Sequence, residues 1–229
     1  MKTLKEIGST IKAIVFDIDG VIVLGSESGK RAAWEKLFEP GTKEAKAVRE
    51  ARLKALESGG NRFTILRRAG EIVGHSGDVL TLFVDKAAER FNQITLGYYE
   101  YLGVNQHDVD ALCLLAEKYQ LFTNSATPVE AQEEVFGNIL HINLFTGLYG
   151  APEGKVEALG RIMKDYLLIP EQVLFVGDDD KDVRAAENVG CRFVGRTNDW
   201  NRWDSIDSRI DFPLVFSLTE LSEGLLAAQ

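Results

Sequence analysis

From residue 103 onward, short apolar runs alternate with amphipathic stretches, and this alternation constrains the fold more than any other feature of the sequence. The runs that predict strands are QLFTNS, LFTGLYG, QVLFVGD and RFVGRT. The stretches that predict helices are HDVDALCLLAEKY, TPVEAQEEVFGNIL, GKVEALGRIMKDYLL, DKDVRAAENVG and LTELSEGLLAAQ. We expect Thr127 to cap the second helix, with Pro128 at its first position, and Gly190 to end the fourth. Strands that alternate with helices are typical of a parallel, doubly wound sheet, so the predicted fold class is α/β.

A long interval separates the first predicted strand from the next one. The run AIVFD, residues 13–17, predicts a strand, but the following strand begins only around Leu121. A strand, a crossover helix and a second strand take roughly 30 residues, which leaves on the order of 70 residues unexplained. Four segments of this interval have helical periodicity: GKRAAWEKLF, KEAKAVREARLKALES, RFTILRRAGEIV and VLTLFVDKAAERFNQITLGYYEYL. We therefore predict a core domain, residues 1–24 and 103–229, with a helical cap domain, residues 25–102, inserted after the first strand.

Composition excludes several classes of function. The formal net charge of -9 and the pI near 5.0 repel polyanions, so neither nucleic acid nor an anionic membrane is expected as a partner. No apolar run approaches the roughly 18 residues that a membrane helix needs. The first residues, MKTLKEIGSTIK, lack the apolar stretch of a secretion signal, so we expect a cytoplasmic protein. Cys113 and Cys191 match no metal or redox spacing and are expected to be buried free thiols.

Polar residues follow four of the predicted strands. Asp17 and Asp19 lie in the DIDG segment after the first strand, and Thr123 and Asn124 end the second. Lys155 follows the third strand, and the acidic segment GDDDKD follows the fourth. Ligands bind beyond the carboxyl ends of the strands in open parallel sheets. We therefore expect these four segments to converge in space.

The residue types in these segments suit magnesium-dependent phosphoryl transfer to a carboxylate. Asp17, Asp178 and a backbone carbonyl of the first turn can supply the hard oxygen ligands that Mg²⁺ prefers. The Thr123 hydroxyl can donate to a phosphate oxygen, and Lys155 can supply a positive charge beside the transferring group. Asp17 is then the carboxylate that attacks phosphorus.

Each of these residues also has a simpler interpretation. An acid-glycine pair is a common turn former, an acidic cluster favours a helix N-terminus, and a lysine at a helix start is usually solvated. The DIDG segment resembles the start of a calcium loop, but Val21 occupies a position that should hold Asp or Asn. The joint placement of the four segments, and not any one of them, favours a functional site.

On these motifs the chain resembles the haloacid dehalogenase superfamily, in the branch whose helical cap follows the first strand. It is similar to phosphatases of the phosphoglycolate phosphatase and beta-phosphoglucomutase type. The matching segments are DIDGV, LFTNS, Lys155 in APEGKVEALG, and VGDDDKDVRAAENVG. The resemblance covers residues 11–195 and implies a Rossmann-like core.

The resemblance also implies roles for individual residues. Asp17 would be the nucleophile and Asp19 the general acid and base. Asp178 would bind the metal directly, Asp182 would support the metal site, and the backbone carbonyl of Asp19 would complete the protein ligands. The resemblance is weaker in the cap, where Arg62, after SGGN, is our prediction for a substrate contact. The segment NDWNRWDS, with Trp200 and Trp203, is expected to have a packing role.

The function predicted from the sequence is hydrolysis of a small phosphorylated metabolite by a Mg²⁺-dependent phosphatase through an aspartyl-phosphate. A phosphomutase uses the same four motifs and is the alternative enzyme, while a noncatalytic binding protein on this fold is the alternative outside enzymology. Dehalogenation is disfavoured because it needs neither a second acid nor a metal, whereas this chain has both Asp19 and Asp178. The substrate and the oligomeric state stay open.

Overall fold

The computed structural model describes residues 3–58, 61–201, 203–204 and 210–227. The chain divides into two compact units. One consists of Met1–Gly25 and Leu102–Gln229, and the other of Ser26–Tyr101. The larger unit contains a parallel sheet, and the smaller one is built from helices.

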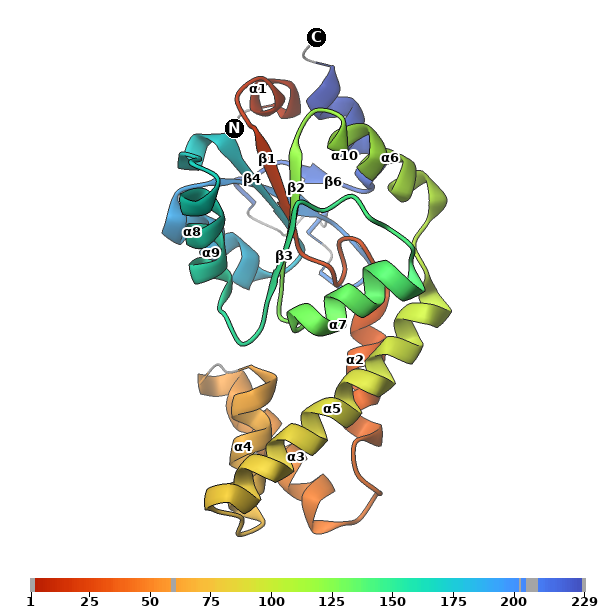
Figure 1. Ribbon diagram of the computed structural model, residues 1–229, viewed down its shortest axis with the longest axis vertical. Coiled ribbons are helices and arrows are strands. Elements are labelled where there is room, and N and C mark those ends of the chain that lie inside the picture. Colours follow the sequence, from red (N-terminus) through yellow and green to blue (C-terminus); the bar gives the residue numbers. More distant parts are fainter. Residues whose placement is uncertain (1–2, 59–60, 202, 205–209, 228–229) are drawn as a thin grey trace. The chain divides into compact units, whose positions relative to one another are not determined.

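The sheet of the larger unit has six parallel strands in the order β3-β2-β1-β4-β5-β6 (Figure 1). The strands are β1 (Ala13–Phe16), β2 (Gln120–Ser125), β3 (Gly147–Gly150), β4 (Val173–Gly177), β5 (Arg192–Arg196) and β6 (Leu214–Val215). All four residues of β1 are fully buried, as expected for a central strand covered on both faces. The predicted fold class, a doubly wound parallel α/β sheet with an inserted helical segment, is confirmed.

Helices cover both faces of this sheet. Those of the larger unit are α1 (Leu4–Gly8), α6 (Gln106–Ala116), α7 (Val129–Glu133), α8 (Lys155–Asp165), α9 (Asp180–Val189) and α10 (Leu218–Leu226). Helices α8 and α9 lie on one side of the sheet, and α6 and α10 lie on the other (Figure 1). Beneath α8 and α9, Leu159 and Ala185 join Val15, Phe122 and Phe175 of the strands in one apolar core.

The start of α9 is fixed by its own acidic residues. Asp179 is the N-cap, and Asp179 and Asp182 form a reciprocal capping box, which satisfies backbone N–H groups that have no partner within the helix. At the other end Gly190 has a φ of 74°, a left-handed conformation that ends the helix as predicted. Gly177 ends β4 immediately before this turn, and a Cβ there would overlap Asp182. The tight turn thus brings the first residues of α9 directly to the end of β4.

The smaller unit is formed by α2 (Ser26–Lys36), α3 (Lys43–Ser58), α4 (Arg62–Ile72) and α5 (Gly77–Leu102). Helix α3 has the bounds that the periodicity predicts, and Asn61 caps α4 by accepting a hydrogen bond from the Thr64 N–H. The apolar core includes Leu37, Leu66 and Phe91, and the Trp34 ring lies 4.7 Å from the Phe91 ring. The unit therefore has a core of its own.

Two local expectations need correction. The helix expected to start at Thr127 begins at Val129 with Pro128 as its N-cap, and it continues as a π-helix over Glu134–Ile139. Cys113 is exposed and Cys191 is only partly buried, whereas both were expected inside. The short elements α1 and β6 were not predicted, because neither is long enough to produce a periodic pattern.

Among the residues described, no helix is both long and apolar enough to span a membrane.

Candidate active site

The register of the sheet places Asp17 at the centre of its carboxyl edge. Phe16, the last residue of β1, is opposite Thr123 on one side and Val176 on the other. The Asp17 N–H donates to the Val176 carbonyl at 2.9 Å, and Asp17 Oδ1 accepts a hydrogen bond from the Ile18 N–H at 2.7 Å. Asp17 is therefore held both by the sheet and by its own turn.

The chain folds tightly back on itself after Asp17. The Ile22 N–H donates to the Ile18 carbonyl at 2.8 Å, and the Gly20 N–H donates to the Val23 carbonyl at 3.0 Å. Gly20 has a φ of 73°, and a Cβ on it would overlap the Asp178 carboxylate, so only glycine suits this position. Asp19 is buried within the turn, where it forms an isolated bridge with Val23.

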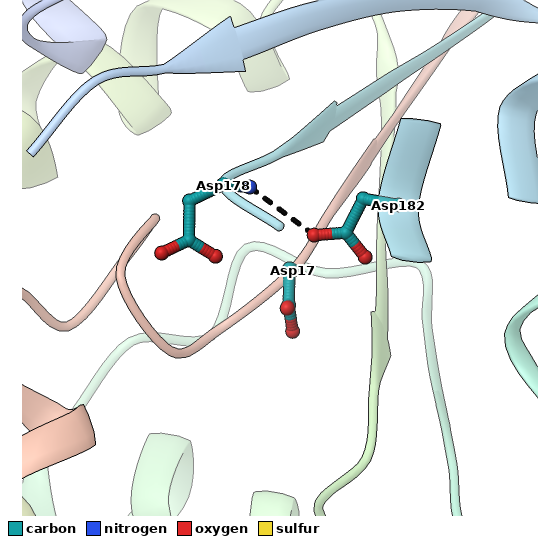
Figure 2. Close-up of side chains that lie close together, drawn as sticks. All are labelled: Asp17, Asp178 and Asp182. Carbon is teal, nitrogen blue, oxygen red and sulfur yellow. Dashed lines mark hydrogen bonds between the residues drawn. The ribbon is translucent and has the colours of Figure 1, made fainter. Parts of the chain in front are cut away.

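Three buried carboxylates gather at the ends of β1 and β4. Asp17, Asp178 and Asp182 each offer one oxygen, and these oxygens lie within 4.8 Å of one another (Figure 2). Asp182 Oδ2 accepts hydrogen bonds from the N–H of Asp178 at 3.1 Å and of Asp179 at 3.2 Å. The start of α9 thus orients Asp182 toward the other two acids.

Lys155, the first residue of α8, neutralises part of this charge. Its Nζ lies 2.7 Å from Asp17 Oδ2 and also contacts Asp182 Oδ1. Burial disfavours the ammonium ion, but the charges of Asp17 and Asp182 more than offset this, so the pKa of Lys155 lies above its usual value. Lys155 therefore stays protonated at neutral pH.

One ammonium group does not balance three carboxylates. The pKa of Asp178 is raised to about 8, mainly by burial and secondly by the negative charge of Asp17. A hydrogen bond from Asn198 opposes this shift. Burial also raises the pKa of Asp182, against the effect of Lys155. The proton affinity of these acids indicates that the site favours an additional positive charge. Its donors are oxygens, the ligand type of a hard divalent cation, so the residues present fit Mg²⁺.

Asn124 and Thr123, at the end of β2, have different partners. Asn124 Nδ2 donates to the backbone carbonyl of Lys155 at 2.9 Å and so ties β2 to the start of α8. Thr123 is fully buried, and its hydroxyl donates to Gln132 Oε1 at 2.6 Å. Gln132 Nε2 donates to the carbonyls of Thr127 at 2.7 Å and Tyr149 at 2.8 Å, which fixes the orientation of the amide. In this conformation the only hydroxyl proton of Thr123 is committed to Gln132, and its predicted contact with phosphate stays a prediction.

Arg62, the predicted substrate contact, belongs to the smaller unit. It is the first residue of α4, and its Nη1 donates to Asn92 Oδ1 at 2.6 Å. The guanidinium carbon lies 4.8 Å from the centre of the Phe91 ring, close enough for a cation-π interaction. Its role toward a substrate stays a prediction.

Sequence reasoning missed the two asparagines that follow β5. Asn198 Nδ2 donates to Asp178 Oδ2 at 2.8 Å, and Asn201 Nδ2 donates to the Asp178 carbonyl at 2.9 Å. The same segment contains Trp200 and Trp203, for which a packing role was predicted. The Trp203 ring packs 5.3 Å from that of Phe212, as expected, while Trp200 is exposed. The polar spacing N-x-x-N was the signal that could have identified the asparagines.

The sequence matches the family model of haloacid dehalogenase-like hydrolases over residues 11–190. No curated protein sequence matches the chain significantly.

Solved structures share the fold at low sequence identity. The 2-haloacid dehalogenase of Pseudomonas syringae is 20% identical, with a TM-score of 0.64 over 95% of this chain and 98% of that one. CbbY of Rhodobacter sphaeroides, in complex with phosphate, is 18% identical, with a TM-score of 0.63 over 92% and 96%. A candidate beta-phosphoglucomutase of Thermotoga maritima is 20% identical, with a TM-score of 0.59 over 96% and 100%. At these identities the likeness shows a common fold, and the reaction has to be argued from the site.

Proposed function

The chain belongs to the haloacid dehalogenase-like hydrolase family, and from this premise we propose that it is a Mg²⁺-dependent phosphatase of small phosphorylated metabolites. One observation carries the proposal: three buried carboxylates and one lysine meet at the carboxyl edge of the sheet. Asp17 and Asp178, with the backbone carbonyl of Asp19, would hold the ion, and Asp182 would support it. Bound Mg²⁺ would offset the repulsion between carboxylate and phosphate and polarise the transferring group.

Asp17 is the proposed nucleophile. One of its carboxylate oxygens forms a bond to phosphorus as the bond between phosphorus and the ester oxygen breaks. Lys155, 2.7 Å from Asp17 Oδ2, keeps a positive charge where negative charge shifts during transfer. Asp182 holds Lys155 from the other side and so fixes the position of the ammonium group.

Asp19 is the proposed general acid and base. It gives its proton to the leaving ester oxygen, which departs as an alcohol. It then takes a proton from water as the water attacks the aspartyl-phosphate, and the bond between Asp17 and phosphorus breaks to release phosphate. The position of Asp19 supports this role, because it is buried in the tight turn that directly follows the nucleophile.

The cluster of acids favours phosphoryl transfer over dehalogenation. Attack on a carbon-halogen bond needs one ionised carboxylate, and further buried acids beside it only raise the cost of that charge. Phosphoryl transfer, by contrast, uses a cation between carboxylate and phosphate, and Asp178 provides a ligand for it.

A panel of substrates tests this proposal. The protein is incubated with small phosphate esters and with 2-haloacids, with and without Mg²⁺, while free phosphate, halide and isomerised sugar phosphate are measured. We expect phosphate release that requires Mg²⁺ and is abolished in Asp17→Asn. Halide release without metal would indicate a dehalogenase, isomerisation a phosphomutase, and no reaction with any ester would favour a binding protein.

We further propose that the helical segment, residues 25–102, selects the substrate and that Arg62 contributes a positive charge to this selection. Arg62→Ala should raise the KM for the preferred ester and leave kcat nearly unchanged, because the residue would bind the substrate equally in the ground and transition states. Arg67→Ala is the matched control, since Arg67 is an exposed arginine of the same helix. Equal KM values for the two variants would contradict the assignment of Arg62.

A further inference from the structure

The segment after β5 turns back across the ends of the two loops that carry the proposed metal ligands. Asn198 lies at its centre and uses both ends of its side-chain amide. Nδ2 donates to Asp178 Oδ2 at 2.8 Å and to the Gly20 carbonyl at 3.2 Å. Oδ1 accepts from the N–H of Trp200 at 2.9 Å and of Asn201 at 3.0 Å. The two acceptors beside Nδ2 and the two donors beside Oδ1 are compatible with only one orientation of the amide, so the direction of its two N–H donors is fixed.

The backbone of Asp178 is held by the same segment. Asn201 Nδ2 donates to the carbonyls of Asp178 and Arg196, each at 2.9 Å. Asn201 Oδ1 accepts from the Asn198 N–H at 3.2 Å. The two asparagines therefore brace one another while one holds the side chain of Asp178 and the other its main chain.

Gly20, Asp178 and Asn198 are closely packed where the two loops meet. A Cβ on Gly20 would overlap the Asp178 carboxylate and would lie 3.0 Å from Asn198 Nδ2. Of the two Asp178 oxygens, Oδ2 accepts the hydrogen bond from Asn198 Nδ2. A donor on one carboxylate oxygen leaves the other oxygen to face a cation and limits rotation of the group.

We propose that Asn198 is a positioning residue for the cation site: it orients the Asp178 carboxylate and couples it to the turn that carries Asp19. The inference rests on the proposed function, because it assigns Asp178 as a ligand of Mg²⁺. Asn198 contacts the ligand and not the ion. Partners of this kind typically change metal affinity by about 10-fold to 100-fold when they are removed.

The alternative is that Asn198 only stabilises its own loop through the Trp200 and Asn201 N–H groups. Two variants separate these roles. Asn198→Ala removes every side-chain bond, whereas Asn198→Ser keeps a short oxygen that can accept from backbone N–H groups of a turn but cannot reach Asp178. The control is Asn188→Ala, since Asn188 is an exposed asparagine whose Nδ2 donates at 2.7 Å to the Arg184 carbonyl.

Binding of Mn²⁺ in the absence of substrate provides a readout that does not depend on activity. The full chain is titrated with Mn²⁺ while free Mn²⁺ is followed by electron paramagnetic resonance, and the melting temperature of each metal-free variant is recorded. We expect about 10-fold to 100-fold weaker binding in Asn198→Ala and in Asn198→Ser. The serine variant should melt closer to the wild type, and Asn188→Ala should bind Mn²⁺ as the wild type does.

The two failures are distinguishable. If the wild type binds Mn²⁺, Asp178→Asn does not, and both Asn198 variants bind as tightly as the wild type, the positioning role is wrong while the proposed function stands. If the wild type itself binds no Mn²⁺, the cation site of the proposed function is wrong, and the inference falls with it.

Discussion

Lys155 Nζ lies 2.7 Å from Asp17 Oδ2, although 138 residues separate the two in sequence. Removing this ammonium group takes a positive charge from the transferring phosphoryl group, so Lys155→Ala should lower kcat by about 10²-fold to 10³-fold. Lys30→Ala is the control, because Lys30 pairs at 3.5 Å with Glu27 on a helix of the smaller unit. Steady-state assays on the preferred ester measure kcat for both variants. Comparable losses in the two variants would contradict the role of Lys155.

The bond from Thr123 to Gln132 predicts a loss of stability. Thr123→Val keeps the shape of the side chain but leaves Gln132 Oε1 buried without this donor, so the free energy of unfolding should fall by about 1–3 kcal/mol. Urea denaturation measures the change, and Thr123→Ser, which keeps the hydroxyl, should lose less. The kcat of folded Thr123→Val separately tests the predicted phosphate contact: a fall of about 10²-fold supports it, and an unchanged kcat opposes it.

The raised pKa of Asp178 predicts how the metal-free protein responds to pH. Burial raises this pKa from 3.8 to about 8, so between these values the native state retains a proton that the unfolded state has lost. The free energy of unfolding should therefore decrease as pH rises from about 4 to about 8. In Asp178→Asn this contribution disappears, and the decrease should be shallower. Thermal melts in a chelator at several pH values measure both slopes, and identical slopes would rule out a raised pKa.

Magnesium should offset this trend. The cation favours ionised Asp178, so the increase in melting temperature that Mg²⁺ produces should grow with pH up to about 8. An increase that is the same at every pH would mean that Asp178 does not lose a proton when the ion binds.

A buried ion pair stabilises the larger unit behind the first turn. Arg196 Nη2 lies 2.7 Å from Asp108 Oδ2, Arg196 Nη1 donates to the Val21 carbonyl, and Asp108 Oδ1 accepts from the Leu218 N–H at 2.9 Å. Asp108→Asn leaves a buried guanidinium without its counter-ion and should cost about 3–5 kcal/mol in unfolding free energy. Asp110 is an exposed aspartate of the same helix, so it serves as the control. Asp110→Asn should change the unfolding free energy by less than about 0.5 kcal/mol. Equal urea midpoints for the two variants would contradict this prediction.

The fold could be predicted because its signals are local and repeated. Apolar runs such as VLFVG and helix ends such as Gly190 each act within a few residues of themselves, and their alternation leaves few arrangements other than a parallel sheet. The approach of Asp17 to Asp178 also follows from the sequence, because the carboxyl ends of adjacent parallel strands share one edge.

Other parts of the site depend on contacts that no local pattern encodes. Asn198 and Gln132 are ordinary polar residues in the sequence, and their partners are set by the paths of loops from three different regions of the chain. The start of α7 was misplaced for a similar reason. Thr127 offers its carbonyl to the Gln132 side chain at 2.7 Å, and the helix begins only after Pro128. Tertiary contacts there determine which residue begins the helix.

In the proposed mechanism, Asp17 carries the phosphoryl group and Asp19 moves the proton. The variants Asp17→Asn and Asp19→Asn should therefore fail at different steps. Asp17→Asn lacks the nucleophile and should form no covalent intermediate. Asp19→Asn keeps the nucleophile, so a substrate with a good leaving group should still phosphorylate it, but hydrolysis of the aspartyl-phosphate should be slow because no base activates water.

Intact-protein mass spectrometry after rapid quenching distinguishes the roles of the two carboxylates. Both variants are mixed with an aryl phosphate and Mg²⁺ and quenched in acid, and their intact masses are measured. The predicted result is a phosphate adduct on Asp19→Asn and none on Asp17→Asn. An adduct on Asp17→Asn, or rapid turnover by Asp19→Asn, would contradict the assignment of the two carboxylates.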